Sequence, residues 1–138
     1  MNITLNRIND HVHFRATNPQ NNTIELDGSE AIGGVNGGFR PMELVLAGLA
    51  GCSLMDLVSI LQKSRQDLKD IQVSVEAQRS EETPGVFTAI QLHYRLHGNL
   101  DTQKVERTLD LAVNKYCSVG AMIGKTAKIT YTYEIIPS

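Results

Sequence analysis

The sequence predicts an α+β fold in which two main helices pack on antiparallel sheet. Three observations support this prediction. Apolar and polar residues alternate with period two in several short segments, as in strands that bury one face. The segment 42–61 is rich in helix formers and shows no such alternation. The segment 105–116 has apolar residues at the spacing of an amphipathic helix, and the 138 residues suit one domain spanning 1–138.

Short strands are expected in the first 27 residues. Apolar Val12, Phe14 and Ala16 alternate with polar neighbours, and a third short strand follows at residues 23–27. Residues 28–38 break all periodicity. Their four glycines after position 32 predict a loop that passes close to other backbone.

A long helix is expected to follow Pro41, which suits the first turn of a helix. Residues 42–61 are apolar on nearly all sides, and a helix of that kind is a buried one. A helix of this length measures about 30 Å, which is too much for a chain of 138 residues to bury on every face. We therefore expect an interface between subunits along this helix.

The remaining elements follow from the same patterns. Residues 71–77 and 90–96 alternate cleanly and form a hairpin through residues 81–85. Asp101 can cap a second helix. The apolar stripe of that helix consists of Val105, Leu109, Ala112, Val113 and Tyr116. A last strand is expected at residues 125–136.

Composition and charge exclude several functions. A net charge of −2 gives no electrostatic basis for binding nucleic acid or an anionic membrane. Residues 1–14 lack the apolar run of a signal peptide, and no segment is expected to span a membrane, so we expect a cytoplasmic protein. The paired histidines at 11 and 13 and at 93 and 97 fit strand surfaces, and no metal site is expected.

Cys52 is the first candidate for chemistry. It lies inside the apolar helix after Gly48 and Gly51, each of which costs about 1 kcal/mol relative to alanine. That cost indicates that something approaches the helix backbone. Cys52 is either a small buried apolar residue or a reactive thiol, and a reactive thiol needs a cation to stabilise its thiolate. Arg40 and Arg15 are the candidates for that cation.

Three further residues are candidates for a role beside Cys52. Asp56 lies one helical turn later and would either hold an arginine against the thiol or make a structural hydrogen bond or salt bridge. Glu43 lies in the first turn, where the helix dipole favours an acid. Cys117 follows the second helix and is either a partly buried free thiol or a disulfide partner of Cys52.

Two segments carry a resemblance to a known family. Residues 37–52 resemble the surroundings of the first cysteine in the OsmC/Ohr family (osmotically inducible protein C / organic hydroperoxide resistance), and residues 115–119 look like its second-cysteine segment. The motif from Arg40 to Asp56 is similar to the OsmC-like branch. The resemblance implies an intertwined homodimer with the long helices buried at its centre.

The resemblance also implies a reaction. Cys52 would attack the O–O bond of an organic hydroperoxide, and the resulting sulfenic acid would condense with Cys117 to a disulfide. A dithiol, of lipoyl type for example, would reduce that disulfide as co-substrate, so no bound cofactor is expected. The activity implied is that of a cysteine-based peroxidase in oxidative stress defence.

The sequence departs from the family at one position. Peroxidase members carry a glutamate directly after the motif proline, where this chain has Met42, and Glu43 stands about 100° further around the helix. The departure motivates a second hypothesis, a non-catalytic dimer that binds a small molecule or senses redox state. A purely structural protein is a third.

Overall fold

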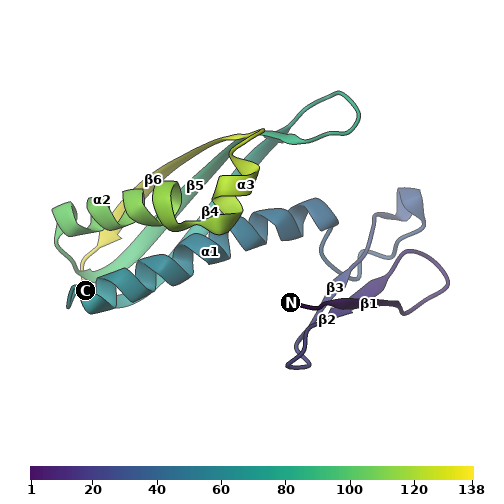
Figure 1. Ribbon diagram of the computed structural model, residues 1–138, viewed down its shortest axis with the longest axis horizontal. Helices are drawn as coiled ribbons and strands as arrows, with labels where there is room; N and C mark the ends of the chain where they lie inside the picture. The colour runs from purple at the N-terminus through teal and green to yellow at the C-terminus, as the bar shows by residue number, and fades with distance from the viewer. The chain divides into compact units, whose positions relative to one another are not determined.

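The computed structural model describes residues 1–138 as two compact units, Met1–Ala47 and Gly48–Ser138. Each unit is described by itself, and Figure 1 shows the elements that belong to each. The α+β class is confirmed, while one domain over the whole chain stays a prediction.

The first unit contains a three-stranded antiparallel sheet in the order β1-β2-β3. Its strands are β1 Thr4–Arg7, β2 Phe14–Thr17 and β3 Thr23–Leu26, which confirms the short strands expected there. The register pairs Leu5 with Ala16 and Phe14 with Leu26. Because side chains alternate between faces, these apolar residues share one face of the sheet.

Glycines let the loop after β3 fold onto itself. A side chain at Gly34 would clash with the backbone of Gly28, and one at Gly38 would clash with Glu25. Phe39 then pairs with β3, its N–H donating to the Glu25 carbonyl oxygen at 2.9 Å. The close backbone approach predicted for residues 28–38 is confirmed, and a short 3-10 helix, η1 Glu30–Ile32, lies inside the loop.

The second unit contains a mixed sheet, so the prediction of purely antiparallel sheet is wrong at one strand pair. Strands β4 Asp67–Arg79 and β5 Phe87–Asn99 are antiparallel, but β5 and β6 Lys128–Ile136 are parallel. The segment between β5 and β6 is a helical crossover. It returns the chain to the end of the sheet where β5 began, so β6 runs in the same direction.

Helices cover one face of this sheet (Figure 1). The long helix α1 Pro41–Lys63 begins in the first unit and continues through the second. The crossover contains α2 Thr102–Asp110, a π-helical turn η2 Leu111–Tyr116 and α3 Ser118–Ile123. Asp101 caps α2 as expected, its carboxylate accepting from the Lys104 N–H at 3.1 Å. The hydrophobic core joins residues of α1, β5 and the crossover: Ala50, Leu57, Leu61, Leu92, Tyr94, Leu96, Val105, Leu109, Ala112 and Val113.

Two expectations about the helices need correction. Tyr116 is 50% exposed, because the wider π turn rotates the end of the predicted apolar stripe away from the core. The apolar segment at α1 is long and apolar enough to cross a membrane by length and composition, with an 18-residue window of mean hydropathy 2.1, which the sequence analysis did not expect. The core helix of a globular protein has the same composition, and Leu57 and Leu61 of α1 are fully buried in the core.

Candidate thiol site

Cys52 lies in the middle of α1, is half-buried and forms no disulfide. The two glycines before it were expected to let another part of the molecule come close. Nothing in this chain lies within 4 Å of a side-chain carbon built at Gly48 or Gly51. The close packing is therefore not made within the chain, and this stretch of α1 stays open.

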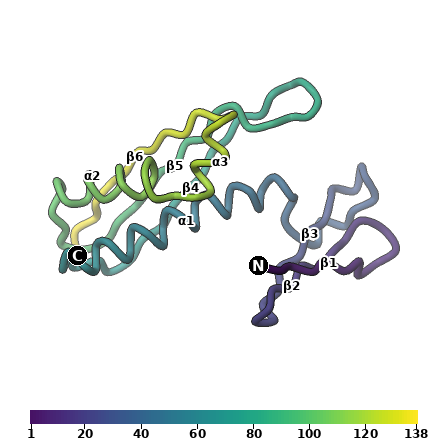
Figure 2. Tube along the Cα trace, viewed as in Figure 1, coloured from purple at the N-terminus to yellow at the C-terminus, as the bar shows by residue number.

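Cys117 is the N-cap residue of α3 and is 4% exposed. Its Sγ accepts a hydrogen bond from the Gly120 N–H at 3.1 Å, and the thiol donates to the Leu49 carbonyl oxygen at 3.9 Å. Leu49 belongs to α1, so the second thiol is anchored one turn from Cys52. Figure 2 shows the path of the chain through α1 and the crossover.

Cys52 lies close enough to Cys117 to act on its thiol. Burial raises the pKa of the Cys117 thiol to about 11, the Gly120 N–H opposes this rise, and the neighbouring Cys52 thiol adds to it. Cys117 is therefore a neutral thiol at physiological pH. Of the two sulfur atoms, that of Cys52 is the more accessible, since Cys52 is half-buried and Cys117 is buried.

A buried hydroxyl pair next to the thiols was missed in the sequence. Ser53 donates to the Ala50 carbonyl oxygen at 2.8 Å and lies 2.6 Å from the Tyr94 hydroxyl. Both residues are fully buried, and burial raises the pKa of Tyr94 to about 12. Two features of the sequence could have indicated this pair. One is a serine next to Cys52 in an apolar helix, and the other is a tyrosine among the apolar residues of one face of β5. The pair fixes the Cys52 turn of α1 against the sheet.

A pocket of about 300 Å³ opens beside Cys117. It is lined by residues of the crossover and the start of β6, including Lys115, Gly120 and Lys128. A small molecule in this pocket would approach the second thiol from the crossover side.

Asp56 lies one turn beyond Cys52 on α1 and is half-buried. It takes part in none of the ion pairs of the chain. The structural salt bridge considered for Asp56 is therefore not made within the chain. Its carboxylate remains available to an arginine from elsewhere.

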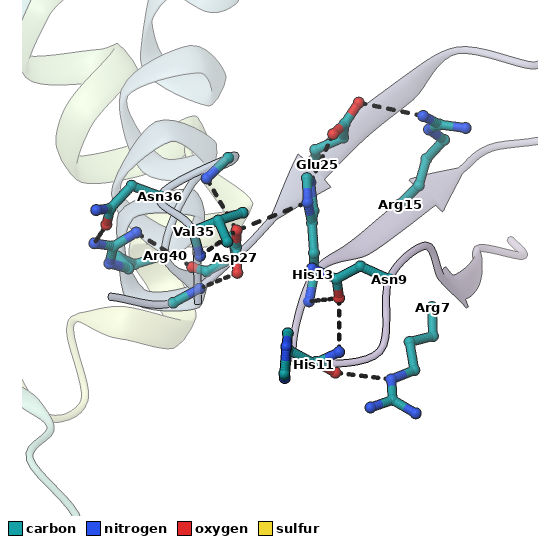
Figure 3. A network of polar contacts seen from close by, with 12 residues as sticks. Arg7, Asn9, His11, His13, Arg15, Glu25, Asp27, Val35, Asn36 and Arg40 are labelled. Carbon is teal, nitrogen blue, oxygen red and sulfur yellow. Dashed lines mark hydrogen bonds and ion pairs between the residues drawn. The ribbon is translucent and has the colours of Figure 1, made fainter. Parts of the chain in front are cut away.

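Arg40 and Glu43 lie in the first unit, where α1 begins. Figure 3 shows the surroundings of Arg40. The Glu43 carboxylate accepts from the Arg40 backbone N–H at 2.7 Å, which is half of a capping box. The Arg40 guanidinium donates to the Asp27 carbonyl oxygen at 3.4 Å and to the Asn36 side chain at 2.5 Å. Glu43 thus stabilises the helix start and makes no ion pair with the Arg40 guanidinium.

Arg15 is exposed on β2 and pairs with Glu25 at 3.5 Å. Glu25 also contacts His13 at 2.7 Å, so His13 is tied to a carboxylate and does not lie free on a strand surface as expected. His13 Nδ1 lies 3.7 Å from the buried Asp27 carboxylate (Figure 3). No group of three potential ligands in the chain is arranged to hold a metal ion.

The fold and the site together define a small α+β protein with two free cysteines close together, one half-buried on a core helix and one buried at the start of α3. The sequence model for OsmC-like proteins matches residues 34–132. The chain belongs to the OsmC-like family, which confirms the resemblance found in the sequence.

Known relatives agree with this assignment. Protein YhfA of Escherichia coli strain K12 is 47% identical over 97 residues, which are 70% of this chain and 72% of YhfA. A crystal structure of a hypothetical protein from Aquifex aeolicus VF5 superposes with a TM-score of 0.86 at 27% identity, covering 99% of this chain and 96% of that chain. The organic hydroperoxide resistance protein OhrB of Bacillus subtilis shares the fold, with a TM-score of 0.65, 17% identity and 96% coverage of both chains.

Proposed function

We propose that the protein is a thiol peroxidase that reduces organic hydroperoxides in defence against oxidative stress. One observation carries the proposal: a half-buried thiol on α1 lies close enough to a buried, neutral thiol to raise the pKa of that second thiol further. A peroxidase needs this asymmetry, because one sulfur must meet the substrate while the other stays in reserve. Structural relatives named for organic hydroperoxide resistance support the same function.

The proposed reaction has three steps. The Cys52 thiolate attacks the terminal oxygen of the hydroperoxide and the O–O bond breaks, which leaves Cys52 as sulfenic acid, while the departing alkoxide takes the proton that the thiol lost and leaves as an alcohol. The Cys117 sulfur then displaces the hydroxyl of the sulfenic acid as water, and a Cys52–Cys117 disulfide forms. A dithiol co-substrate such as a lipoyl group reduces the disulfide by exchange and is itself oxidised to a disulfide.

The Cys52 thiolate needs a positive charge, and we propose that an arginine supplies it. Arg15 and Arg40 are the candidates, and the unpaired carboxylate of Asp56, one turn from Cys52, is suited to hold the arginine used. Replacing each arginine by glutamine and measuring the rate of Cys52 oxidation would show which of the two acts.

We further propose that the protein is a cytoplasmic homodimer in which the α1 helices of two chains pack together. The open backbone at Gly48 and Gly51 and the exposed apolar side chain of Met55 support this arrangement. A second chain covering them would bury the faces of α1 that this chain leaves open.

One observation favours a second candidate, a non-catalytic dimer that binds a small molecule or senses redox state. Met42 stands where peroxidase relatives carry a glutamate, and Glu43 caps the helix without pairing with the Arg40 guanidinium. If no other acid holds the activating arginine, the fold and the thiols remain but the rapid chemistry does not.

A stoichiometric experiment separates the two candidates. The reduced protein receives one equivalent of cumene hydroperoxide or hydrogen peroxide, and free thiols are counted over seconds to minutes. We expect rapid loss of both thiols, faster with the organic peroxide. Cys52→Ser should abolish the loss, and Cys117→Ser should stop the reaction at a Cys52 sulfenic acid that dimedone traps.

The experiment can also exclude the peroxidase. Slow loss of thiols, with the same rate for both peroxides and no turnover with a dithiol, would exclude the peroxidase. The non-catalytic dimer would then be the function to pursue.

A further inference from the structure

The pocket of about 300 Å³ beside Cys117 leads to this cysteine from the crossover side. The residues that line it belong to the helical crossover, to the turn that follows it and to the start of β6, and none of them belongs to α1. Cys117 is one of the lining residues, although only 4% of it is exposed. The volume is at the lower end of the range of about 300–1,000 Å³ that is typical of small-molecule sites.

The pocket carries an unbalanced positive charge. Lys115 of η2 and Lys128 of β6 line it, and no acidic residue does. Neither lysine takes part in any of the ion pairs of the chain. The contact of the Lys115 ammonium is uncharged, since it lies 5.4 Å from the centre of the Tyr116 ring. Two ammonium groups without a carboxylate between them favour a ligand with a negative charge.

Gly120 leaves room beside the Cys117 sulfur. A side-chain carbon at this position would lie 3.3 Å from the Sγ atom, which is tighter than ordinary van der Waals contact. Gly120 also lines the pocket, so the sulfur has no side chain covering it there. The Gly120 N–H donates to Sγ at 3.1 Å and stays available to a thiolate formed at Cys117.

Disulfide exchange in this arrangement favours attack at Cys117. An incoming thiolate enters in line with the S–S bond, from the side opposite to the sulfur that leaves. The pocket lies on the crossover side of Cys117, whereas Cys52 lies on α1. Burial raises the pKa of the Cys117 thiol to about 11, which makes Cys117 a poor leaving group. Attack at Cys117 expels Cys52 instead.

We propose that the dithiol which reduces the Cys52–Cys117 disulfide is negatively charged, docks in this pocket with its charge on Lys115 and Lys128, and attacks the Cys117 sulfur. The proposal rests on the proposed peroxidase, because it concerns the disulfide that this reaction forms. The reductant and the hydroperoxide then use different entrances, one at Cys117 and the other at Cys52.

The exchange takes place in two steps. A thiolate of the dithiol bonds to the Cys117 sulfur, the S–S bond breaks, and its electron pair leaves on Cys52 as a thiolate. The second thiol of the reductant loses its proton and attacks the reductant sulfur bound to Cys117. Cys117 is expelled and takes up a proton. The protein disulfide gains two electrons, and the dithiol that supplies them becomes a cyclic disulfide.

The charge preference is tested on a disulfide prepared without hydroperoxide. Diamide oxidises the full-length protein, and dihydrolipoate or dihydrolipoamide then reduces it, two dithiols that differ in the negative charge. Free protein thiols are counted after acid quenching. Dihydrolipoate should react about three- to tenfold faster at low salt, because the lysines attract it. The advantage should fall below about twofold at about 0.5 M salt, where the charges are screened.

Three variants locate the preference in the pocket. The double variant Lys115→Gln/Lys128→Gln should remove it and leave the rate with dihydrolipoamide within about twofold. Gly120→Ala, which adds a methyl group beside the sulfur, should slow both dithiols. Lys125→Gln is the matched control, because Lys125 is an exposed lysine of the same segment that does not line the pocket, and the preference should persist.

A charged monothiol identifies the sulfur that is attacked. 2-Mercaptoethanesulfonate should form a mixed disulfide with Cys117 and free Cys52, which iodoacetamide then alkylates, and peptide masses distinguish the two positions. A mixed disulfide at Cys52 would overturn the proposal. Equal rates for the two dithiols, an unchanged preference in the double lysine variant, or failure of diamide to join Cys52 to Cys117 would overturn it as well.

Failure of this proposal and failure of the peroxidase give different results. Loss of thiols to cumene hydroperoxide without a charge preference in the reduction step would leave the peroxidase standing and remove the docking site. A charge preference in the diamide-formed disulfide, in a protein whose thiols react slowly with hydroperoxide, would support the docking site and exclude the peroxidase alone.

Discussion

Cys117 shows how strongly its immediate surroundings act on a single residue. It is buried at the start of α3, and burial raises the pKa of its thiol to about 11 although the Gly120 N–H partly stabilises the thiolate. The neutral thiol is protected from adventitious oxidation, because the thiolate is the reactive species. Protection of the second cysteine keeps it available for disulfide formation after Cys52 reacts.

The titration of Cys117 can be measured in the Cys52→Ser protein. Burial, the largest cause of the raised pKa, remains in this variant, so thiolate absorbance at 240 nm should appear only well above pH 9. The pKa of Cys117 is higher in the folded state than in the unfolded state. The contribution of Cys117 to the free energy of unfolding is therefore fully present below the unfolded pKa and is lost as the pH rises toward about 11. Titration at the value found in urea would contradict the prediction.

Asp27 is a second residue whose pKa is set by its surroundings. Burial would raise the pKa of its carboxyl, but hydrogen bonds from Gly37, Gly28 and Val35 and the charge of His13 outweigh burial and lower the pKa below 3.8. The three backbone donors come from both ends of the loop at residues 28–38. The ionised carboxylate therefore holds the loop closed.

Asp27→Asn should lower the melting temperature at pH 7, because an amide replaces a carboxylate among backbone donors. The pKa is depressed by folding, so the stability from Asp27 is present above pH 3.8 and is lost as the pH falls through the lower folded value. Melting curves from pH 7 to pH 2.5 should therefore converge for the two proteins. Glu30→Gln, an exposed acid in the same loop, is the control and should melt like the wild type.

At the scale of elements, the hydroxyl pair between α1 and β5 fixes where Cys52 stands. Ser53 and Tyr94 are 41 positions apart in the chain, and their side chains join the helix to the central strand of the sheet. Ser53 has a second partner in the Ala50 carbonyl oxygen, whereas the Tyr94 hydroxyl has only Ser53. The two residues are therefore not equivalent.

This asymmetry predicts unequal effects on stability. Ser53→Ala strands the buried Tyr94 hydroxyl and should lower the free energy of unfolding by about 1–3 kcal/mol. Tyr94→Phe leaves Ser53 bonded to Ala50 and should cost about 0.5–1.5 kcal/mol. Urea denaturation of the two single variants and of the double variant measures these free energies of unfolding. The double variant should be no less stable than Ser53→Ala. A larger loss for Tyr94→Phe than for Ser53→Ala would refute the assignment.

At the scale of the whole molecule, α1 presents more apolar surface than its own chain covers. Met55 is 76% exposed and lines, with Leu54 and Val58, a surface hollow of about 390 Å³ on the helix. A contiguous apolar face of this kind marks an interaction site, which is the basis for the proposed dimer.

Met55→Lys should shift the protein from dimer to monomer in sedimentation velocity, because burying an unpaired ammonium between two helices is strongly unfavourable. Met122→Lys provides a matched control, since Met122 is a 66% exposed methionine on α3, and this variant should remain dimeric. A dimer that tolerates Met55→Lys would place the interface elsewhere.

Local patterns were sufficient to predict most elements of this protein. Alternation identified β4 and β5, Asp101 marked the start of α2, and the apolar segment after Pro41 identified α1, with Cys52 at its centre. The family followed from the residues around the two cysteines. These features depend on residues a few positions apart, where the helix and strand periods dictate which side chains share a face.

Contacts between distant residues required the folded chain. The parallel pairing of β6, the Ser53–Tyr94 pair and the carboxylate of Asp27 among three loop N–H groups could not be read from any local pattern. Each depends on the path of a crossover or loop, because the free energy of such a contact is gained only when the whole unit closes around it. The proximity of Cys52 and Cys117 is of this kind: the resemblance pairs the two residues, and the helical crossover brings Cys117 near enough to Cys52 for the two thiols to interact.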